Sequence, residues 1–303
     1  MSLTSSQLNS LRSLPCFEKV VDISLLIDGM SHTCIKVTTA LQVFFVKKLN
    51  SETAETEVLS SKYAAKHGLS PRIIYHDNAW LVTDYIVGIT LDKNELSSSQ
   101  CIDTGLTLMA KLHQLVPQPN AKTIPCLDTS ESVRRLFTNP NSIPSQQKLF
   151  LADITETLTL KIGIEQKRSD VTNIICHGDI NYSNIIIDET RQSWLIDFEC
   201  SHLAPVDFDL SMFIAINNIS PLHIDEIVNR YMSLVPSYKP NKILLTYYLL
   251  YSYFINGLWY LDNTNDAKIN NHLRSLAIEQ WSAFDSFVVK YHLDIPKLMP
   301  LIS

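Results

Sequence analysis

Several features of specialised proteins are missing from this 303-residue sequence. With 7 glycines and 13 prolines, the composition is neither that of a fibrous protein nor that of a disordered one. Basic residues form no long run and the net charge is −6, which argues against a general nucleic-acid-binding protein. The hydrophobic content of 46% indicates a folded globular protein that can bury a large core.

The cysteines also lack any functional grouping. All six are scattered, without a C-x-x-C pair or a histidine at metal-site spacing, and this pattern predicts reduced thiols. Residues 1–14 are rich in serine and lack the basic start and apolar stretch of a secretory signal. We therefore expect a cytoplasmic protein.

One apolar segment, residues 243–261, is nineteen residues long without a charge, which is about the length that spans a bilayer. Five tyrosines interrupt it, together with Asn256 and Gly257. Tyrosine belongs at membrane interfaces more than at the bilayer centre. We expect a buried helix here and no membrane span.

The first hundred residues consist of short strand-like runs separated by turn residues, with one helical pattern among them. The pair Asp28-Gly29 between the first two runs is typical of a hairpin. Gly68 and Pro71 follow the helical pattern, as expected at a helix end. Strands are predicted at 20–27, 33–37, 42–49, 72–75 and 80–84, and a helix at 52–67.

From Ser98 onward the apolar periodicity is helical. The exception is a hairpin, predicted from the apolar runs 184–188 and 193–196 with a polar turn between them. The sequence thus predicts an α+β protein with two lobes. Residues 1–86 form a small lobe with an antiparallel sheet and one helix, and residues 87–303 form a larger, mainly helical lobe.

The chemistry is concentrated on both sides of that hairpin. Asp179 lies five residues before Asn184, which is the spacing of the base and the magnesium-binding asparagine in the protein-kinase catalytic loop. Asp197 follows the second run and begins an Asp-Phe pair, like the metal ligand of protein kinases, although Glu199 stands in place of their glycine. Phosphoryl transfer from ATP needs such a carboxylate near the attacking hydroxyl and such ligands for magnesium.

These segments resemble the choline/ethanolamine kinase and aminoglycoside phosphotransferase superfamily, whose fold is similar to that of protein kinases. The resemblance rests on residues 177–184 (HGDINYSN), 195–199 (LIDFE) and 207–210 (DFDL), and it extends over nearly the whole chain. It implies ATP and Mg²⁺ as cofactors, with Asn184 and Asp197 as metal ligands. It also implies that His177 and Asp209 support the catalytic loop.

The same resemblance places a phosphate-binding lysine at the end of the third strand, where Lys47 and Lys48 are adjacent. Strand alternation puts the two on opposite faces and does not choose between them. The apolar-basic-apolar ending of the family favours Lys48. The expected partner of this lysine on the helix is Glu57, with Glu52 and Glu55 as alternatives. The simplest interpretation of each of the three is a glutamate exposed to solvent.

Two further nucleotide contacts are implied by the resemblance. The segment 28–33, which contains Ser31, occupies the place of the phosphate-covering turn, although it has a single glycine where protein kinases have three. The strand that starts at Trp80 resembles the hinge, whose backbone at Asp84, Tyr85 and Ile86 would bind adenine. A plain core strand is the competing interpretation.

The acceptor pocket is expected in the helical lobe. Residues 254–259 resemble a choline-kinase stretch in which two tryptophans surround a quaternary ammonium, but the first of these positions is Asn256. Trp259, Trp281 and Glu199 are further candidates for contact with a cationic substrate, and Asp179 and Asp197 add to the negative charge. Aromatic side chains on a helix are more often part of the core.

The sequence therefore predicts an ATP- and magnesium-dependent kinase that phosphorylates a hydroxyl of a small amino alcohol or cationic metabolite, nearer to the choline and thiamine kinases. An aminoglycoside-type phosphotransferase is the alternative within the enzyme class. A kinase-like protein that only binds nucleotide is the alternative from another class. The acceptor and the oligomeric state stay open.

Overall fold

The computed structural model describes residues 4–26, 33–116, 124–136, 145–169, 171–263 and 270–301. The chain divides into two compact units, of which the first comprises Met1–Pro125 with Tyr182–Ser201 and the second Cys126–Asn181 with His202–Ser303. The predicted α+β class is confirmed. The boundary after Ile86 stays a prediction about the lobes, since the compact units divide at other positions.

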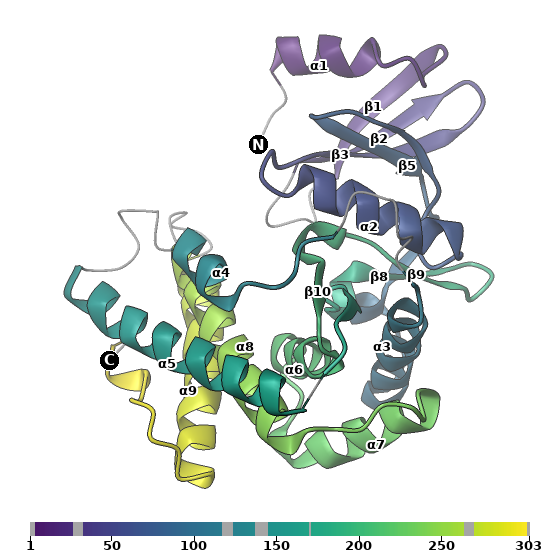
Figure 1. Ribbon diagram of the computed structural model, residues 1–303. Helices are drawn as coiled ribbons and strands as arrows, with labels where there is room; N and C mark the ends of the chain where they lie inside the picture. The colour runs from purple at the N-terminus through teal and green to yellow at the C-terminus, as the bar shows by residue number, and fades with distance from the viewer. Residues whose placement is uncertain are drawn as a thin grey trace. The chain divides into compact units, whose positions relative to one another are not determined.

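The first unit is built on an antiparallel five-stranded sheet with the order β1-β2-β3-β5-β4 (Figure 1). All five predicted strands are present, each within two residues of its expected ends. Short apolar runs bounded by turn residues were therefore a sufficient signal for this sheet. The strands are β1 (Val20–Leu26), β2 (Cys34–Thr39), β3 (Val43–Lys48), β4 (Ile73–His76) and β5 (Trp80–Asp84).

Two helices cover opposite faces of this sheet, α1 (Ser5–Arg12) and α2 (Ala54–Lys66). Leu11 and its neighbours pack on the face formed by Ile35, Val37, Phe44, Val46, Trp80 and Val82. Val58 of α2 packs on the other face, against Leu49 and Leu81. The helix α1 was not predicted, although the capping box between Thr4 and Gln7 is a recognisable start signal.

A second sheet in the first unit has the order β6-β8-β9. It contains the predicted hairpin, as β8 (Ile185–Asp188) and β9 (Ser193–Leu195), and adds β6 (Gly88–Thr90), which was not predicted. The helix α3 (Ser98–His113) begins at a capping box between Ser97 and Gln100 and contacts β9. Short 3₁₀ helices are η1 (Leu91–Lys93), η2 (Tyr182–Asn184) and η3 (Phe198–Cys200).

The second unit is mainly helical, as predicted. Its long helix α8 (Lys242–Asp262) packs against α4, α5, α6 and α9. A two-stranded sheet joins β7 (Ile174–Cys176) to β10 (His202–Ala204); strands of three residues are too short to show a period in the sequence. The other elements are α4 (Thr129–Leu136), α5 (Ser145–Ser169), α6 (Val206–Ile216), α7 (Ile224–Leu234), α9 (Asn270–Lys290), η4 (Pro221–His223) and η5 (Met299–Leu301).

The apolar segment 243–261 forms most of α8, and Tyr248, Tyr251 and Tyr253 of this helix are buried. Tyr248, for example, is 1% exposed and accepts a hydrogen bond from Gln166 of α5 at 2.7 Å. This is the buried helix that the sequence predicted. Within the described ranges, no helix has the length and apolar character needed to cross a membrane.

Asp207, in the first turn of α6, is a buried carboxyl group that should make stability depend on pH. Its side chain is 2% exposed, and the Tyr238 hydroxyl donates to its Oδ1 at 3.0 Å. Burial raises the pKa of this carboxyl to about 6, although the Tyr238 bond opposes the shift. The folded protein thus holds this proton more tightly than the unfolded chain, whose carboxyl keeps an ordinary pKa.

We therefore expect the Asp207 contribution to fold stability to fall as the pH rises from about 4 to about 6 and then to stay constant. Asp207→Asn keeps an acceptor for Tyr238 but removes the charge. Its free energy of unfolding relative to wild type should rise over this window by about 1–3 kcal/mol. Urea unfolding at a series of pH values measures this difference. Asp225→Asn, at an exposed position of α7, should show no such window, and a pH-independent difference for Asp207→Asn would contradict the assignment.

Candidate active site

Lys47 of β3 is the centre of a buried cluster of charged side chains in the first unit. Its Nζ lies 2.8 Å from Glu57 Oε1, 2.6 Å from Asp197 Oδ1 and 3.3 Å from Glu199 Oε2. Lys47 is 3% exposed and Glu57 is 1% exposed, whereas Asp197 is 30% and Glu199 is 19% exposed. The two less buried carboxylates form the open side of the cluster.

Strand alternation explains why Lys47 occupies this place. Phe44 and Val46 point to the α1 face of the sheet, so Lys47 points to the α2 face, where Glu57 is available one turn into the helix. Lys48 ends the strand and is exposed. The sequence-based pairing of Lys48 with Glu57 was therefore wrong, because Glu57 pairs with Lys47. That Glu57 supports a phosphate-binding lysine stays a prediction.

The cluster contains more negative than positive groups. Burial alone would lower the pKa of Lys47, but Asp197, Glu57 and Glu199 together raise it, so its ammonium stays charged. Burial raises the pKa of Glu57 to about 7, against the opposing effect of Lys47. Glu57 Oε2 is buried without a hydrogen-bond partner among the described side chains. One ammonium thus faces three carboxyl groups in a poorly solvated place.

Asp197 owes its position to an unusual backbone conformation. It follows β9 with φ of 67°, in the left-handed region that non-glycine residues seldom adopt, and η3 begins directly after it. Phe198, which is fully buried, anchors this turn. Such strain is found mainly where a side chain has a function. Carboxylate oxygens of Glu57, Asp197 and Glu199 lie within 4.8 Å of one another, close enough to share a cation.

Asn184 directly precedes β8, so it lies at the same open end of the hairpin as Asp197, and it is 8% exposed. Its carbonyl oxygen accepts a hydrogen bond from the amide of Ile196 at 3.0 Å. The β8–β9 hairpin therefore holds the backbones of Asn184 and of the residue before Asp197 together. This is the return of the chain that the spacing of the two predicted metal ligands requires.

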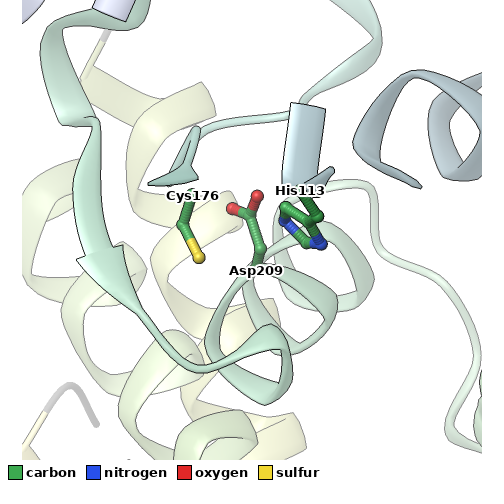
Figure 2. A group of neighbouring side chains, drawn as sticks. All are labelled: His113, Cys176 and Asp209. Atoms are coloured by element: carbon green, nitrogen blue, oxygen red, sulfur yellow. The ribbon is translucent and has the colours of Figure 1, made fainter. Parts of the chain in front are cut away.

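The second unit carries the first part of the catalytic loop. Gly178 has φ of 76°, which favours glycine, and the amides of His177 and Gly178 donate to the two carboxylate oxygens of Asp209 at 3.0 and 2.8 Å. Figure 2 shows Asp209 on α6 beside Cys176, the residue that ends β7 just before this loop. Asp209 thus supports the loop in the way the sequence predicted, and its effect on catalysis stays a prediction.

His177 is fully buried and has a structural contact of its own. Its Nδ1 accepts a hydrogen bond from the amide of Asp179 at 3.2 Å, so this nitrogen carries no proton. The side-chain amide of Asn181 donates to Asp179 Oδ1 at 3.0 Å, and the side-chain amide of Asn217 donates to the carbonyl of Ile180 at 2.9 Å. The orientation of Asp179 is therefore fixed from several sides.

Tyr260 of α8 lies in the electrostatic field of Asp179. Burial, with smaller contributions from the charges of Asp179 and Glu279, raises the pKa of the Tyr260 phenol to about 12. Trp259 contacts the Tyr260 ring with 5.5 Å between the centroids, and both residues are half-buried. In the second unit, Tyr260 thus lies near the carboxylates of Asp179 and Glu279, and the ring of Trp259 packs against it.

The other two acceptor candidates lie inside the helix packing. Asn256 is 9% exposed, and its amide donates to Gln280 of α9 at 3.3 Å. Trp281 is 1% exposed, and its indole donates to the carbonyl of Phe254. A methyl group on Gly257 would meet this indole at 2.1 Å. The structure supports the core interpretation of Trp281 and contradicts its prediction as a substrate contact.

The three predicted hinge residues differ in whether their backbone groups already make hydrogen bonds within the protein. The amide of Asp84 donates to Arg72 and the amide of Tyr85 donates to Val43, so both are used in the sheet. The backbone of Ile86 makes no hydrogen bond within the described parts of the chain. Ser31 lies outside the described residues.

Several residues of the site were not predicted from the sequence. Asn181 is in the loop but has no fixed place in the spacing that identified Asp179. Tyr260 follows Trp259 directly, and Glu279 is one of many acidic residues on a helix. A sequence pattern has no signal for these contacts, because they arise from the folding of separate elements.

The sequence and the fold are both similar to those of known proteins. The family model for choline/ethanolamine kinase matches residues 26–288. The Arabidopsis thaliana protein named "Probable choline kinase 2" is 26% identical over 163 residues, which is 52% of this chain and 45% of that protein. The chain thus matches less than half the length of that curated relative.

Solved structures show the same fold. A choline kinase from Streptococcus pneumoniae superposes with a TM-score of 0.67 at 17% identity, over 91% of this chain and 97% of the other. A spectinomycin phosphotransferase in complex with ADP and spectinomycin gives a TM-score of 0.56 at 15% identity, over 98% and 96% of the chains. With the family match over most of its length, the chain belongs to the choline/ethanolamine kinase family.

Proposed function

We propose that this protein transfers the γ-phosphoryl group of ATP to a hydroxyl group of a small amino alcohol or related cationic metabolite. The observation that carries the proposal is the buried Lys47, held by Glu57 and Asp197. A charged lysine fixed by a helix carboxylate is the cation that phosphoryl transfer needs on the phosphates. The family match and the ADP complex of the solved spectinomycin phosphotransferase support the use of a nucleotide.

Binding of ATP would use the first unit. Lys47 would contact the phosphates, while Glu57 keeps its ammonium in place. The backbone of Ile86 is available to hydrogen-bond adenine, unlike the amides of Asp84 and Tyr85. Backbone contacts leave the side chains of the hinge free to vary.

The donor set fits magnesium, which prefers carboxylate and other oxygen ligands and is usually held by one or two carboxylates together with substrate phosphates. Asn184 and Asp197 would hold the ion, and Glu199 adds a carboxylate on the open side of the cluster. When bound, magnesium neutralises charge on the phosphates.

Asp179 is the base or orienting group for the acceptor. The hydroxyl oxygen forms a bond to the γ-phosphorus, the bond from that phosphorus to the bridging oxygen of ADP breaks, and the hydroxyl proton passes to Asp179. The side-chain amide of Asn181 donates to Oδ1 of this carboxylate at 3.0 Å and orients it. Asp209 and His177 keep the loop in the required conformation.

A cationic acceptor is supported by the groups around Asp179. Trp259 and Tyr260 offer aromatic rings, which attract ammonium groups. Asp179 and Glu279 add negative charge next to Tyr260. The chain as a whole carries a net charge of −6, which also favours a cation over an anion.

An acceptor screen tests the proposal directly. The protein is mixed with ATP, Mg²⁺ and choline, ethanolamine, thiamine or kanamycin in turn, and ADP release is measured together with the mass of the product. We expect phosphorylation of at least one of the amino alcohols or thiamine. Phosphorylation of kanamycin alone would favour the aminoglycoside-type alternative. ATP binding without transfer to any acceptor would favour a protein that only binds nucleotide.

Asp179→Asn should lower kcat by about 10³-fold because the amide cannot accept the hydroxyl proton. Affinity for ATP should stay within about twofold of wild type, since Asp179 has no role in nucleotide binding. Steady-state kinetics and calorimetry measure the two quantities. Asp225→Asn on the surface of α7 is the matched control with the same change of charge. Turnover at the wild-type rate in Asp179→Asn would remove this residue from the mechanism.

Lys47→Met should lower kcat/KM for ATP by about 100-fold or more, because the phosphates lose their cation while the carboxylates remain. Lys48→Met removes the neighbouring exposed lysine and should change kcat/KM by less than about twofold. Thermal unfolding of both variants checks that they are folded. Equal losses in the two variants, or a larger loss in Lys48→Met, would contradict the assignment of Lys47.

A further inference from the structure

A cavity of about 410 Å³ lies in the first unit, away from the charged cluster around Lys47. Its walls are the end of α2 at Gly68 and Leu69, the side of α3, and the β8–β9 turn with the start of β9. A neighbouring cavity of about 510 Å³ shares Leu69 and Lys111 with it and adds His67. The space is sufficient for a small metabolite.

Two exposed cations line this cavity without an ion-pair partner in the described part of the chain. Lys111 of α3 and Arg191 of the β8–β9 turn make no ion pair with any residue that the structure describes. Arg191 has φ of 67°, because it ends the turn in a left-handed conformation. In a chain whose net charge is −6, two unpaired cations at one cavity are an uneven distribution of charge.

Among the other polar groups of the cavity, Ser193 contributes a hydroxyl group that can donate a hydrogen bond to an oxyanion. The hydroxyl groups of Thr104 and Thr107 instead donate to the carbonyls of Gln100 and Asp103, at 2.8 and 2.7 Å. Asp103 is the one carboxylate among its lining residues. In the neighbouring cavity, His67 Nδ1 donates to the carbonyl oxygen of Tyr63 at 2.8 Å.

We propose that this cavity binds a small anionic metabolite with a phosphate or carboxylate group, held by Lys111 and Arg191. The ligand would occupy the cavity between α3 and the β8–β9 turn. This site is separate from the proposed ATP site, and the proposal does not depend on the reaction proposed above.

The walls of the cavity are connected to the hairpin that carries Asn184 and Asp197. The Gln192 side chain donates to the carbonyl of Gly68 at 3.3 Å, and the amide of Leu195 donates to the carbonyl of Leu69 at 2.7 Å. Leu195 lies two residues before Asp197. An anion that holds Arg191 against α3 would therefore also stabilise the contact between the hairpin and the end of α2, the helix that positions Glu57.

Calorimetry with pyrophosphate and with citrate tests the site on the full chain. A saturating non-hydrolysable ATP analogue is present, and Lys47→Met is titrated in parallel without it, so that binding at the nucleotide site cannot be mistaken for this one. We expect at least one probe to bind in both experiments. Pyrophosphate binding indicates a phosphate ligand, and citrate binding indicates a carboxylate ligand.

The variant Lys111→Glu with Arg191→Glu should weaken this binding by about tenfold or more. Lys167→Glu with Lys297→Glu changes two exposed lysines elsewhere and is the control with the same change in net charge; it should bind as wild type does. Absence of binding by either probe to the wild-type protein, or equal binding by the two double variants, would overturn the proposal.

Hydrogen exchange gives an independent readout. The amide of Leu195 should exchange more slowly when the bound probe is present, because its bond to Leu69 opens less often. In the double variant at Lys111 and Arg191, the probe should no longer slow this exchange. A weaker fold does not affect this result, because each protein is compared with itself, with and without the probe. Unchanged exchange of Leu195 in the wild-type protein on binding would overturn the proposed connection to the hairpin.

Discussion

The burial of one lysine among three carboxyl groups is the constraint on which the rest of the first unit depends. Lys47 can stay charged at 3% exposure only because Glu57, Asp197 and Glu199 surround its ammonium. To bring these groups together, β3 must face α2, α2 must present Glu57 in its first turns, and the β8–β9 hairpin must end beside them. Hydrophobic packing of Val58 on Leu49 and Leu81 fixes the helix in that position.

The second unit solves a similar problem with backbone donors. Asp209 is buried, and it accepts the amides of His177 and Gly178, so its charge is balanced by oriented dipoles. These bonds hold the loop in a conformation that needs glycine at position 178. The backbone that carries Asp179 is thus held by hydrogen bonds, and in the proposed reaction this would lower the cost of reaching the reactive geometry.

Local patterns in the sequence were sufficient for the sheet of the first unit, the β8–β9 hairpin and the Asp179, Asn184 and Asp197 spacing. They could not choose Lys47 over Lys48, because alternation defines two faces but does not say which face a distant helix covers. The three-residue strands β6, β7 and β10 were missed for want of a period. Trp281 was misread because an aromatic side chain on a helix has the same sequence signal in a pocket and in a core.

If the proposed function holds, the negative groups around Lys47 oppose nucleotide binding until a metal ion joins them. The affinity of the wild-type protein for a non-hydrolysable ATP analogue, measured by calorimetry with Mg²⁺ and with a chelator, tests this most directly. Binding should be at least about tenfold tighter with Mg²⁺, since the ion neutralises the phosphates next to Asp197 and Glu199. Equal or tighter binding in the chelator would contradict the account.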